Sequence, residues 1–172
     1  YNMSNTGMDP EIFEAFIEQL RRYVRERLIP AEDEVIANDR IPDEILNEMR
    51  EMGLFGITIP EEYGGAGMSI SQYIETVKQL SYAAPAYRST MSINVGMTGS
   101  AIRKFGTPEQ KAHWLPRIAS GEIACFGLTE PGSGSDSAAM QTMATRSGNG
   151  YVLNGTKRYI TNSPHAKIGL IM

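Results

Sequence analysis

The period of the hydrophobic pattern changes at Gly121, and this change constrains the fold more than any other feature of the sequence. Before Gly121, apolar residues recur at the spacing of helices that bury one face. After it, short apolar runs are separated by turn residues, which is typical of strands. The pattern predicts an α+β protein, with a helical domain at residues 1–121 and the start of a β-domain at residues 122–172.

Local signals mark where the helices of the first domain begin. Asp9 precedes Pro10, which is the pattern of an N-cap followed by proline at the first helical position. Ser69 and Thr107 each stand three residues before a glutamine, which is the spacing of a capping box. The helix after Ser69 carries an apolar stripe that we expect to face the core, formed by Ile70, Tyr73, Ile74, Val77 and Leu80.

Proline and glycine residues predict how these helices end. Pro30 should end or bend the first helix, and a polar segment follows it. A second helix should begin near Pro42 and stop at Gly53. The helix at about residues 86–105 mixes apolar and small residues on several sides, which predicts a central helix with close neighbours.

The β-domain should consist of short strands. Two of the predicted strands flank the sequence SGNG, where Asn149-Gly150 favours a type I′ hairpin turn. The final run, KIGLIM, stops in the middle of a strand-like pattern, so we expect the 172 residues to be a fragment. The strands are expected at residues 123–129, 142–146, 151–157, 158–162 and 167–172.

Composition excludes several classes of function. A net charge of −4 does not favour nucleic acid or an anionic membrane surface as a partner. No apolar run approaches the roughly 20 residues of a membrane span, and the first ten residues do not resemble a leader peptide. The single cysteine, Cys125, suggests a reducing compartment. We therefore expect a cytoplasmic protein, with the mitochondrial matrix left open as a second location.

The stretch CFGLTEPGSGSDSAAM, at residues 125–140, is the most informative part of the β-domain. A phosphate loop of the Walker type would need a lysine after the second glycine, and none follows Gly134. Two interpretations remain open from the residues themselves. The stretch could be a flexible linker, or a ligand-binding loop whose glycines let the backbone approach a ligand closely.

Four segments resemble the acyl-CoA dehydrogenase family, and they occur in the family's order. The most specific is GLTEPGSGSD at residues 127–136, which resembles the family signature. The second is LNGTKRYITN at residues 153–162, where Tyr159 stands in place of the usual Trp. The other two are GLFGITIPEEYGGAG at residues 53–67 and FGTPEQKAHWLPRIASGE at residues 105–122.

The resemblance implies a helical N-terminal domain followed by roughly the first half of a middle β-barrel domain. It also implies FAD as cofactor and oxidation of the Cα–Cβ bond of an acyl-CoA thioester to a trans-2-enoyl-CoA. Further implied partners are an electron-acceptor flavoprotein and other copies of the chain, in a tetramer when full length. The family's catalytic base is a carboxylate of a C-terminal helical domain. We therefore expect no catalytic residue within residues 1–172, and an inactive fragment.

The resemblance further implies where the cofactor binds. Thr129 should lie near the flavin N5 atom, and Tyr159 should pack on the flavin ring. Ser135 matches a serine that contacts the pantetheine–phosphate arm of the acyl-CoA substrate. Glu130 is expected to be a structural, hydrogen-bonded carboxylate and not the base. The implied cofactor-binding residues are Phe126, Leu128, Thr129, Ser135, Tyr159, Ile160 and Thr161.

Two other functions fit the same sequence. A flavin oxidase or monooxygenase would share the fold, and a non-catalytic helical interaction module would make no use of the β-segment. Neither His113 nor His165 has a partner at the spacing of metal ligands, so we expect no metal site.

Overall fold

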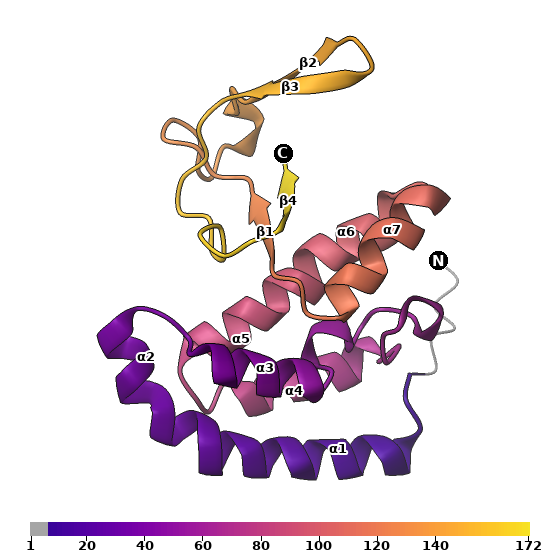
Figure 1. Ribbon diagram of the computed structural model, residues 1–172, viewed down its shortest axis with the longest axis vertical. Coiled ribbons are helices and arrows are strands. Elements are labelled where there is room, and N and C mark those ends of the chain that lie inside the picture. Colours follow the sequence, from indigo (N-terminus) through magenta and orange to yellow (C-terminus); the bar gives the residue numbers. More distant parts are fainter. Residues whose placement is uncertain (1–6) are drawn as a thin grey trace.

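The computed structural model describes residues 7–172. A group of helices occupies the lower part of the molecule in Figure 1, and two pairs of strands rise from it. This arrangement confirms the prediction of a helical region followed by short strands. The expectation that the N-terminus is not a leader falls mainly on residues 1–6, which lie outside the described part.

The first helix bends at Pro30 and continues beyond it. The N–H of Ile29 donates to the carbonyl of Val24, which makes a wider turn just before a proline that has no N–H of its own. The polar segment after Pro30 is therefore helical, which the sequence analysis did not predict. The bent helix has four parts, visible along the bottom and left of Figure 1: α1 (Pro10–Tyr23), η1 (Val24–Leu28), η2 (Ile29–Ala31) and α2 (Glu32–Asn38).

The predicted helix starts are confirmed by hydrogen bonds. The Asp9 carboxylate accepts from the N–H groups of the first turn of α1. The capping boxes at Ser69 and Thr107 both form. The remaining helical elements are α3 (Asp43–Glu51), η3 (Leu54–Gly56), η4 (Glu61–Tyr63), α4 (Ile70–Leu80), α5 (Pro85–Ser92), η5 (Ile93–Gly99), α6 (Ser100–Phe105), α7 (Pro108–Ala119) and, after the first strand, the short η6 (Ser137–Ala139).

The apolar stripe predicted for α4 is only partly buried. Leu80 is buried as predicted, but Ile70 and Ile74 are 64% and 59% exposed, and the polar residues Thr76 and Gln79 are buried in their place. The cause is tertiary, because α4 packs against α1 and α5, and these neighbours meet a face that is rotated from the most apolar one. The prediction that the whole stripe faces the core is therefore wrong.

The central helix is built from α5, η5 and α6, which follow one another without a break. Its buried residues include Tyr87 and Met91 in α5, and the polar residues Asn94 and Thr98 in the π-helical η5. The main core lies between this helix and the elements α1 to α4. A second, smaller cluster joins α7 to the strands and consists of Ile59, Leu115, Ile118, Ala124 and Ile168.

Two separate pairs of strands follow Gly121, whose φ of 90° turns the chain from α7 toward the first strand. In the first pair, β1 and β4 are parallel, with Ala124 opposite Ile168. In the second pair, β2 and β3 form an antiparallel hairpin. Their bounds are β1 (Ala124–Gly127), β2 (Met143–Ser147), β3 (Gly150–Asn154) and β4 (Ile168–Ile171).

The hairpin turn lies one residue earlier than predicted. Ser147 pairs with Gly150, so the two turn residues are Gly148 and Asn149. Gly148 has a φ of 59°, whereas Asn149 is not among the residues with positive φ. A positive φ at the first central position alone fits a type II′ turn, and the predicted type I′ turn would need positive φ at both.

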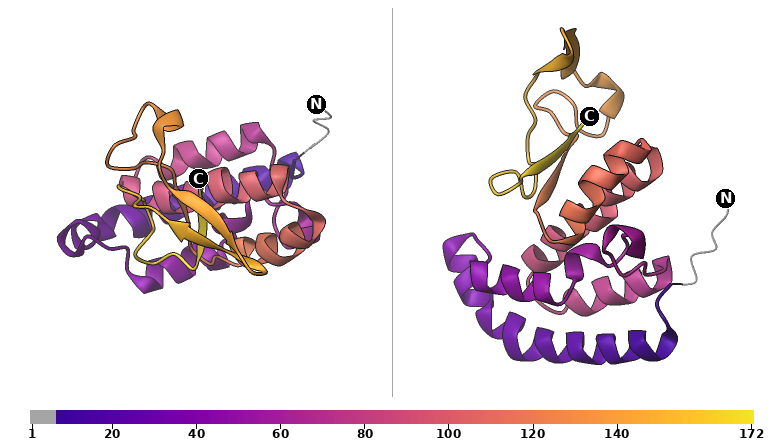
Figure 2. Two further views of the ribbon diagram at one scale, coloured as in Figure 1. Left: turned by 90° about the horizontal axis from the view of Figure 1, so that it is seen from above. Right: turned by 45° about the vertical axis from the view of Figure 1, so that its right-hand side comes forward.

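The hairpin projects away from the helices, as Figure 1 and the right-hand view of Figure 2 show. All ten of its strand residues are exposed. Within residues 7–172, no helix combines the length and the apolarity that crossing a bilayer requires.

Candidate cofactor site

Residues 158–162 lie beside residues 124–129, which comprise β1 and the two residues after it. The N–H of Arg158 donates to the carbonyl of Thr129 at 2.8 Å. At the other end, the side-chain amide of Asn162 donates to the carbonyl of Ala124 at 3.0 Å. The two segments therefore run in opposite directions next to each other. This arrangement brings together the two groups of residues for which the resemblance implied contact with the cofactor.

The segment between these anchors is not a strand, so the strand predicted at residues 158–162 is wrong. Tyr159 and Asn162 have φ values of 59° and 70°, in the left-handed region that extended chains do not use. The Asn162 side chain reaches the carbonyls of Ala124 and Thr90 in place of backbone pairing. A side-chain anchor of this kind depends on a partner distant in sequence, so the strand-like pattern did not reveal it.

The end of β1 carries hydrogen-bond donors that the described residues do not satisfy. Within residues 7–172, the N–H groups of Leu128 and Thr129 and the Thr129 hydroxyl have no partner. Their carbonyls are both used, because Leu128 accepts from the Lys157 ammonium at 3.0 Å and Thr129 accepts from Arg158. Unpaired donors on half-buried residues fit a ligand that has acceptor atoms at its edge, as a flavin ring has.

The other residues predicted to contact the cofactor differ in exposure. Phe126 and Ile160 are half-buried, and Thr161 is exposed. The Tyr159 ring is 79% exposed, and the Arg158 guanidinium lies 4.6 Å from its centroid. An exposed ring held by a neighbouring cation is available for stacking on a flat ligand.

Ser135 lies in an exposed loop that follows β1. The loop is closed by paired backbone hydrogen bonds between Glu130 and Ser133, and by the Ser133 hydroxyl, which donates to the carbonyl of Asp136 at 2.6 Å. Ser133, and not Ser135, therefore forms the turn. A side chain added at Gly132 or Gly134 would meet no atom within 4 Å, so the loop is open on that side.

Glu130, at the start of this loop, forms an ion pair with Lys157. Glu130 Oε1 and Lys157 Nζ are 2.8 Å apart, and the two side chains are only 6% and 10% exposed. The carboxylate also accepts from the N–H groups of Gln141 and Thr142, at 2.7 and 2.9 Å. The bond from Lys157 is the main cause that lowers the pKa of Glu130 to about 2, and the bonds from Thr142 and Gln141 add to it.

These contacts confirm the prediction that the Glu130 carboxylate is hydrogen-bonded, but the sequence analysis did not identify Lys157 as its partner. A signal was present in the sequence. Residues 123–172 contain only two acidic side chains, Glu130 and Asp136, so few partners exist for a buried lysine in this region.

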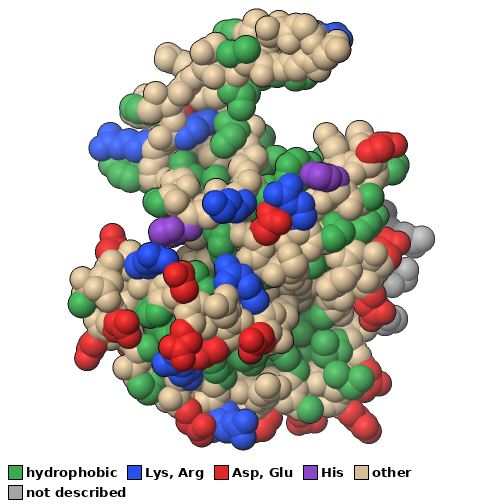
Figure 3. Space-filling view, viewed as in Figure 1, with side chains coloured by type: hydrophobic (Ala, Val, Ile, Leu, Met, Phe, Trp, Pro, Cys, Tyr) green, Lys and Arg blue, Asp and Glu red, His purple; other side chains and the backbone are tan. Residues whose placement is uncertain are grey.

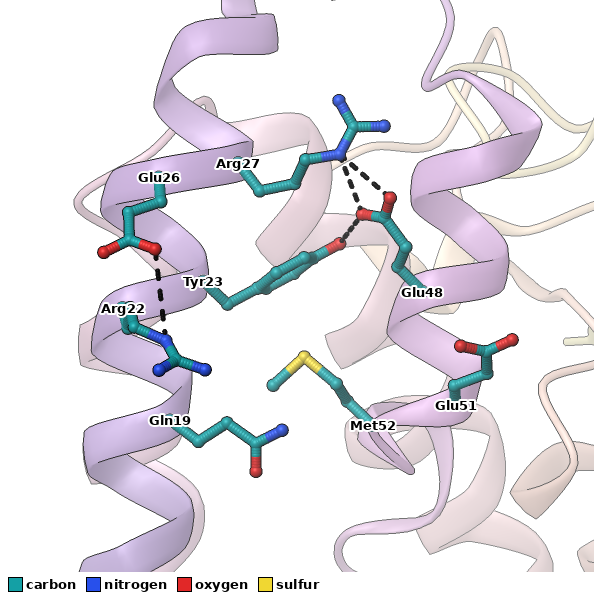
Figure 4. A pocket seen from close by; sticks show the side chains of 8 residues that line it. All are labelled: Gln19, Arg22, Tyr23, Glu26, Arg27, Glu48, Glu51 and Met52. Carbon is teal, nitrogen blue, oxygen red and sulfur yellow. Dashed lines mark hydrogen bonds and ion pairs between the residues drawn. The ribbon is translucent and has the colours of Figure 1, made fainter.

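A groove of about 590 Å³ lies elsewhere, between α1, η1 and α3. Figure 4 shows Tyr23 and Arg27 pointing at the Glu48 carboxylate from the opposite wall. The Tyr23 hydroxyl donates to Glu48 at 2.8 Å, and burial together with this bond raises the tyrosine's pKa. The groove is lined by charges of both signs that bind one another, and it includes none of the residues predicted to contact cofactor or substrate.

Charge is unevenly distributed over the molecule. Acidic side chains gather over the helical part in Figure 3, whereas residues 122–172 carry four Lys or Arg and three Asp or Glu.

Within the described residues, no group of three or more His, Cys, Asp or Glu side chains is arranged to hold a metal ion.

Comparison with known proteins agrees with this geometry. The family model "Acyl-CoA dehydrogenase, N-terminal domain" matches residues 10–122, and "Acyl-CoA dehydrogenase, middle domain" matches residues 125–172. The chain belongs to the acyl-CoA dehydrogenase family. The resemblance found in the four sequence segments is thereby confirmed.

Individual relatives place the chain in the same family. An acyl-CoA dehydrogenase of Bacillus subtilis is 36% identical over 152 residues, which are 88% of this chain and 40% of the relative. Butyryl-CoA dehydrogenase from Megasphaera elsdenii has a TM-score of 0.87 at 31% identity, covering 95% of this chain and 44% of that one. A glutaryl-CoA dehydrogenase from Mycobacterium smegmatis, solved in complex with FADH2, has a TM-score of 0.86 at 33% identity, covering 98% and 44%.

The chain spans about two fifths of the length of the curated Bacillus subtilis relative. The two solved relatives are named for different acyl groups, butyryl and glutaryl, so they do not assign one acyl group to this chain.

Proposed function

We propose that the whole protein is an FAD-dependent dehydrogenase that converts acyl-CoA thioesters to trans-2-enoyl-CoA products. The observation that carries the proposal is the set of unpaired donors at Leu128 and Thr129, beside the segment that holds Tyr159. Family membership supports it, as does the FADH2 in the solved relative.

The described residues suit one side of a flavin ring. The N–H groups of Leu128 and Thr129 and the Thr129 hydroxyl would donate to the polar edge of the ring, and Phe126 would contact its surface. Tyr159, Ile160 and Thr161 would cover the adjacent part. When bound, FAD would supply the chemistry by accepting the hydrogen from Cβ as hydride, while the protein supplies position and hydrogen bonds.

The remaining roles follow from the same assignment. Ser135, exposed in its open loop, would contact the arm of the acyl-CoA and the cofactor. An electron-acceptor flavoprotein would reoxidise the enzyme, and the chain would assemble with copies of itself. A reducing compartment, the cytoplasm or the mitochondrial matrix, suits the single free cysteine, which is buried.

The base that removes the α-proton is assigned to no residue of this chain. Glu130 directly follows Thr129, one of the proposed cofactor residues, and its oxygens are occupied by Lys157, Gln141 and Thr142. A lowered pKa and three donors make it a poor acceptor for a substrate proton. We therefore expect the 172-residue chain by itself not to dehydrogenate acyl-CoA.

The test uses the protein expressed from its complete reading frame. We expect FAD to copurify with it, and a series of acyl-CoA substrates to reduce an artificial electron acceptor. Absence of flavin would favour the non-catalytic interaction module, and turnover as fast with oxygen as with the acceptor would favour an oxidase. The 172-residue chain, supplied with saturating FAD, is the matched sample, and turnover above the rate without enzyme would place a base within it.

A further inference from the structure

The ion pair between Glu130 and Lys157 is unusual because it is almost fully buried while lying next to the proposed cofactor site. Every hydrogen of the Lys157 ammonium has an acceptor nearby, namely Glu130 at 2.8 Å, the Leu128 carbonyl at 3.0 Å and the Met140 sulfur at 3.6 Å. No position is left for a ligand. A direct contact between Lys157 and a cofactor or substrate is therefore not the role that this arrangement supports.

The pair joins three stretches of chain that have no common secondary structure. Lys157 comes from the stretch after β3, and Glu130 from the loop after β1. Through Gln141 and Thr142, the Glu130 carboxylate also holds the chain just before β2. Apart from the bonds that Lys157 makes, one bond within residues 7–172 connects the first two stretches in the same place, from the N–H of Arg158 to the carbonyl of Thr129.

The residues beside the pair are those with proposed contacts to FAD. Leu128 and Thr129, with their unpaired N–H groups, immediately precede Glu130. Tyr159 and Ile160 follow Lys157 by two and three residues. The pair therefore spans the short distance between the donors at the end of β1 and the segment that would cover the ring.

Energetics separate a positioning role from a role in stability alone. Burying two charges costs solvation, and the attraction between them offsets that cost only when the geometry and the additional hydrogen bonds are good. A well-packed apolar pair of similar size often stabilises a fold equally well. What an apolar pair does not supply is a set of directional bonds to the Leu128 carbonyl and to the N–H groups of residues 141 and 142.

We propose that Lys157 and Glu130 are positioning residues, which hold the free donors of Leu128 and Thr129 in register with residues 159–161 so that both can contact FAD. This inference rests on the proposed function for its ligand. The ion pair also orders residues 128–130 and 158–162, and this ordering does not depend on whether FAD binds.

The test compares Lys157→Met with Lys167→Met in the complete protein. Lys157→Met removes the buried charge, and Lys167→Met makes the same change at an exposed lysine nearby. Amide hydrogen exchange of the flavin-free protein is expected to rise at residues 128–130 and 158–162 in Lys157→Met, with no change in the helices. The loss of charge-assisted bonds that position the donors should weaken FAD binding by about tenfold or more, and the midpoint potential of bound FAD should shift. Lys167→Met should match the wild type in each measurement.

A second variant keeps the inference testable if Lys157→Met does not fold. Glu130→Gln preserves shape and one acceptor oxygen while removing the charge. The double variant should weaken FAD binding no more than the stronger single variant, because the two residues act as one unit. Unchanged exchange at both segments would overturn the inference, as would wild-type FAD affinity and potential in both single variants. Failure of the wild type to bind FAD would instead refute the proposed function, while the exchange measurement would still test the ordering role.

Discussion

The side chain of Asn94 accepts a hydrogen bond from the N–H of Ala124 at 2.8 Å and donates to the carbonyl of Glu122 at 2.6 Å. One fully buried amide in η5 thereby fixes the start of β1 on the central helix. The neighbouring Thr98 hydroxyl adds a bond to the carbonyl of Cys125 at 3.2 Å. β1, which carries Phe126 and leads directly into Leu128 and Thr129, is therefore attached to the helical part through side chains of the central helix.

Replacement of Asn94 by Ala should destabilise the protein. Two buried backbone groups would lose their partners, and the expected loss is about 2–3 kcal/mol of unfolding free energy. Asn154→Ala, at an exposed position of β3, is the control and should change stability by less than about 0.5 kcal/mol. Urea denaturation measures both. Equal effects of the two substitutions would mean that Asn94 does not anchor β1.

Gly121→Ala should also destabilise the fold. Gly121 has a φ of 90°, and an added Cβ would collide with the side chain of Arg50, whose Nε donates to the Gly121 carbonyl. Backbone strain and the displaced arginine predict a loss of about 1–3 kcal/mol. Gly132→Ala is the matched control, because Gly132 has no positive φ and an added Cβ there meets no atom within 4 Å. A thermal melt of both variants tests the difference.

Thr129→Ala should weaken the proposed contact to the flavin. With the hydroxyl donor gone, we expect a lower flavin potential and slower reduction by substrate, by about 1.5–3 kcal/mol in activation free energy. Stopped-flow reduction of the complete protein gives the rate. Thr145→Ala, at an exposed position in β2, is the control. If Thr129→Ala is reduced at the wild-type rate, Thr129 does not contact the ring.

Tyr159 offers a test of ring contact. We expect Tyr159→Ala to release FAD more readily and Tyr159→Trp to retain it, because flat aromatic area is what the stacking contact requires. Tyr159 has a φ of 59°. Ala and Trp both carry a Cβ, as Tyr does, so neither substitution relieves backbone strain at this position. Dialysis followed by flavin fluorescence measures retention. Equal release from all three proteins would exclude Tyr159 from the site.

The Glu130 carboxylate predicts a specific loss of stability in acid. Its pKa is lowered from 4.5 to about 2 in the folded protein, so the ionised form stabilises the fold above pH 4.5. That contribution decreases as the pH falls from 4.5 toward 2, where the folded protein takes up the proton. Unfolding free energy measured across this range should fall less steeply in Glu130→Gln. The exposed Glu62→Gln should retain the wild-type slope.

The helix starts, the hairpin and the order of the two parts were predictable because they depend on residues close in sequence. Asp9, Ser69 and Thr107 satisfy N–H groups no more than three residues away, so their caps form in any context that lets the helix exist. The Gly-rich loop was also recognisable, because its segment resembles a family signature that is local in the chain. The amino-acid sequence by itself therefore determined the α+β class, most helix boundaries and the family.

Tertiary structure decided which faces are covered and which segments meet. Ile70 and Ile74 match a helical stripe, yet they are exposed because α1 and α5 pack on a different face of α4. Residues 158–162 have a strand-like pattern, but two positive φ values and the Asn162 side chain hold them in a loop. The partner of Glu130 lies 27 residues away at Lys157. Burial and long-range pairing depend on which residues the folded chain brings together, and the local sequence pattern does not contain that information.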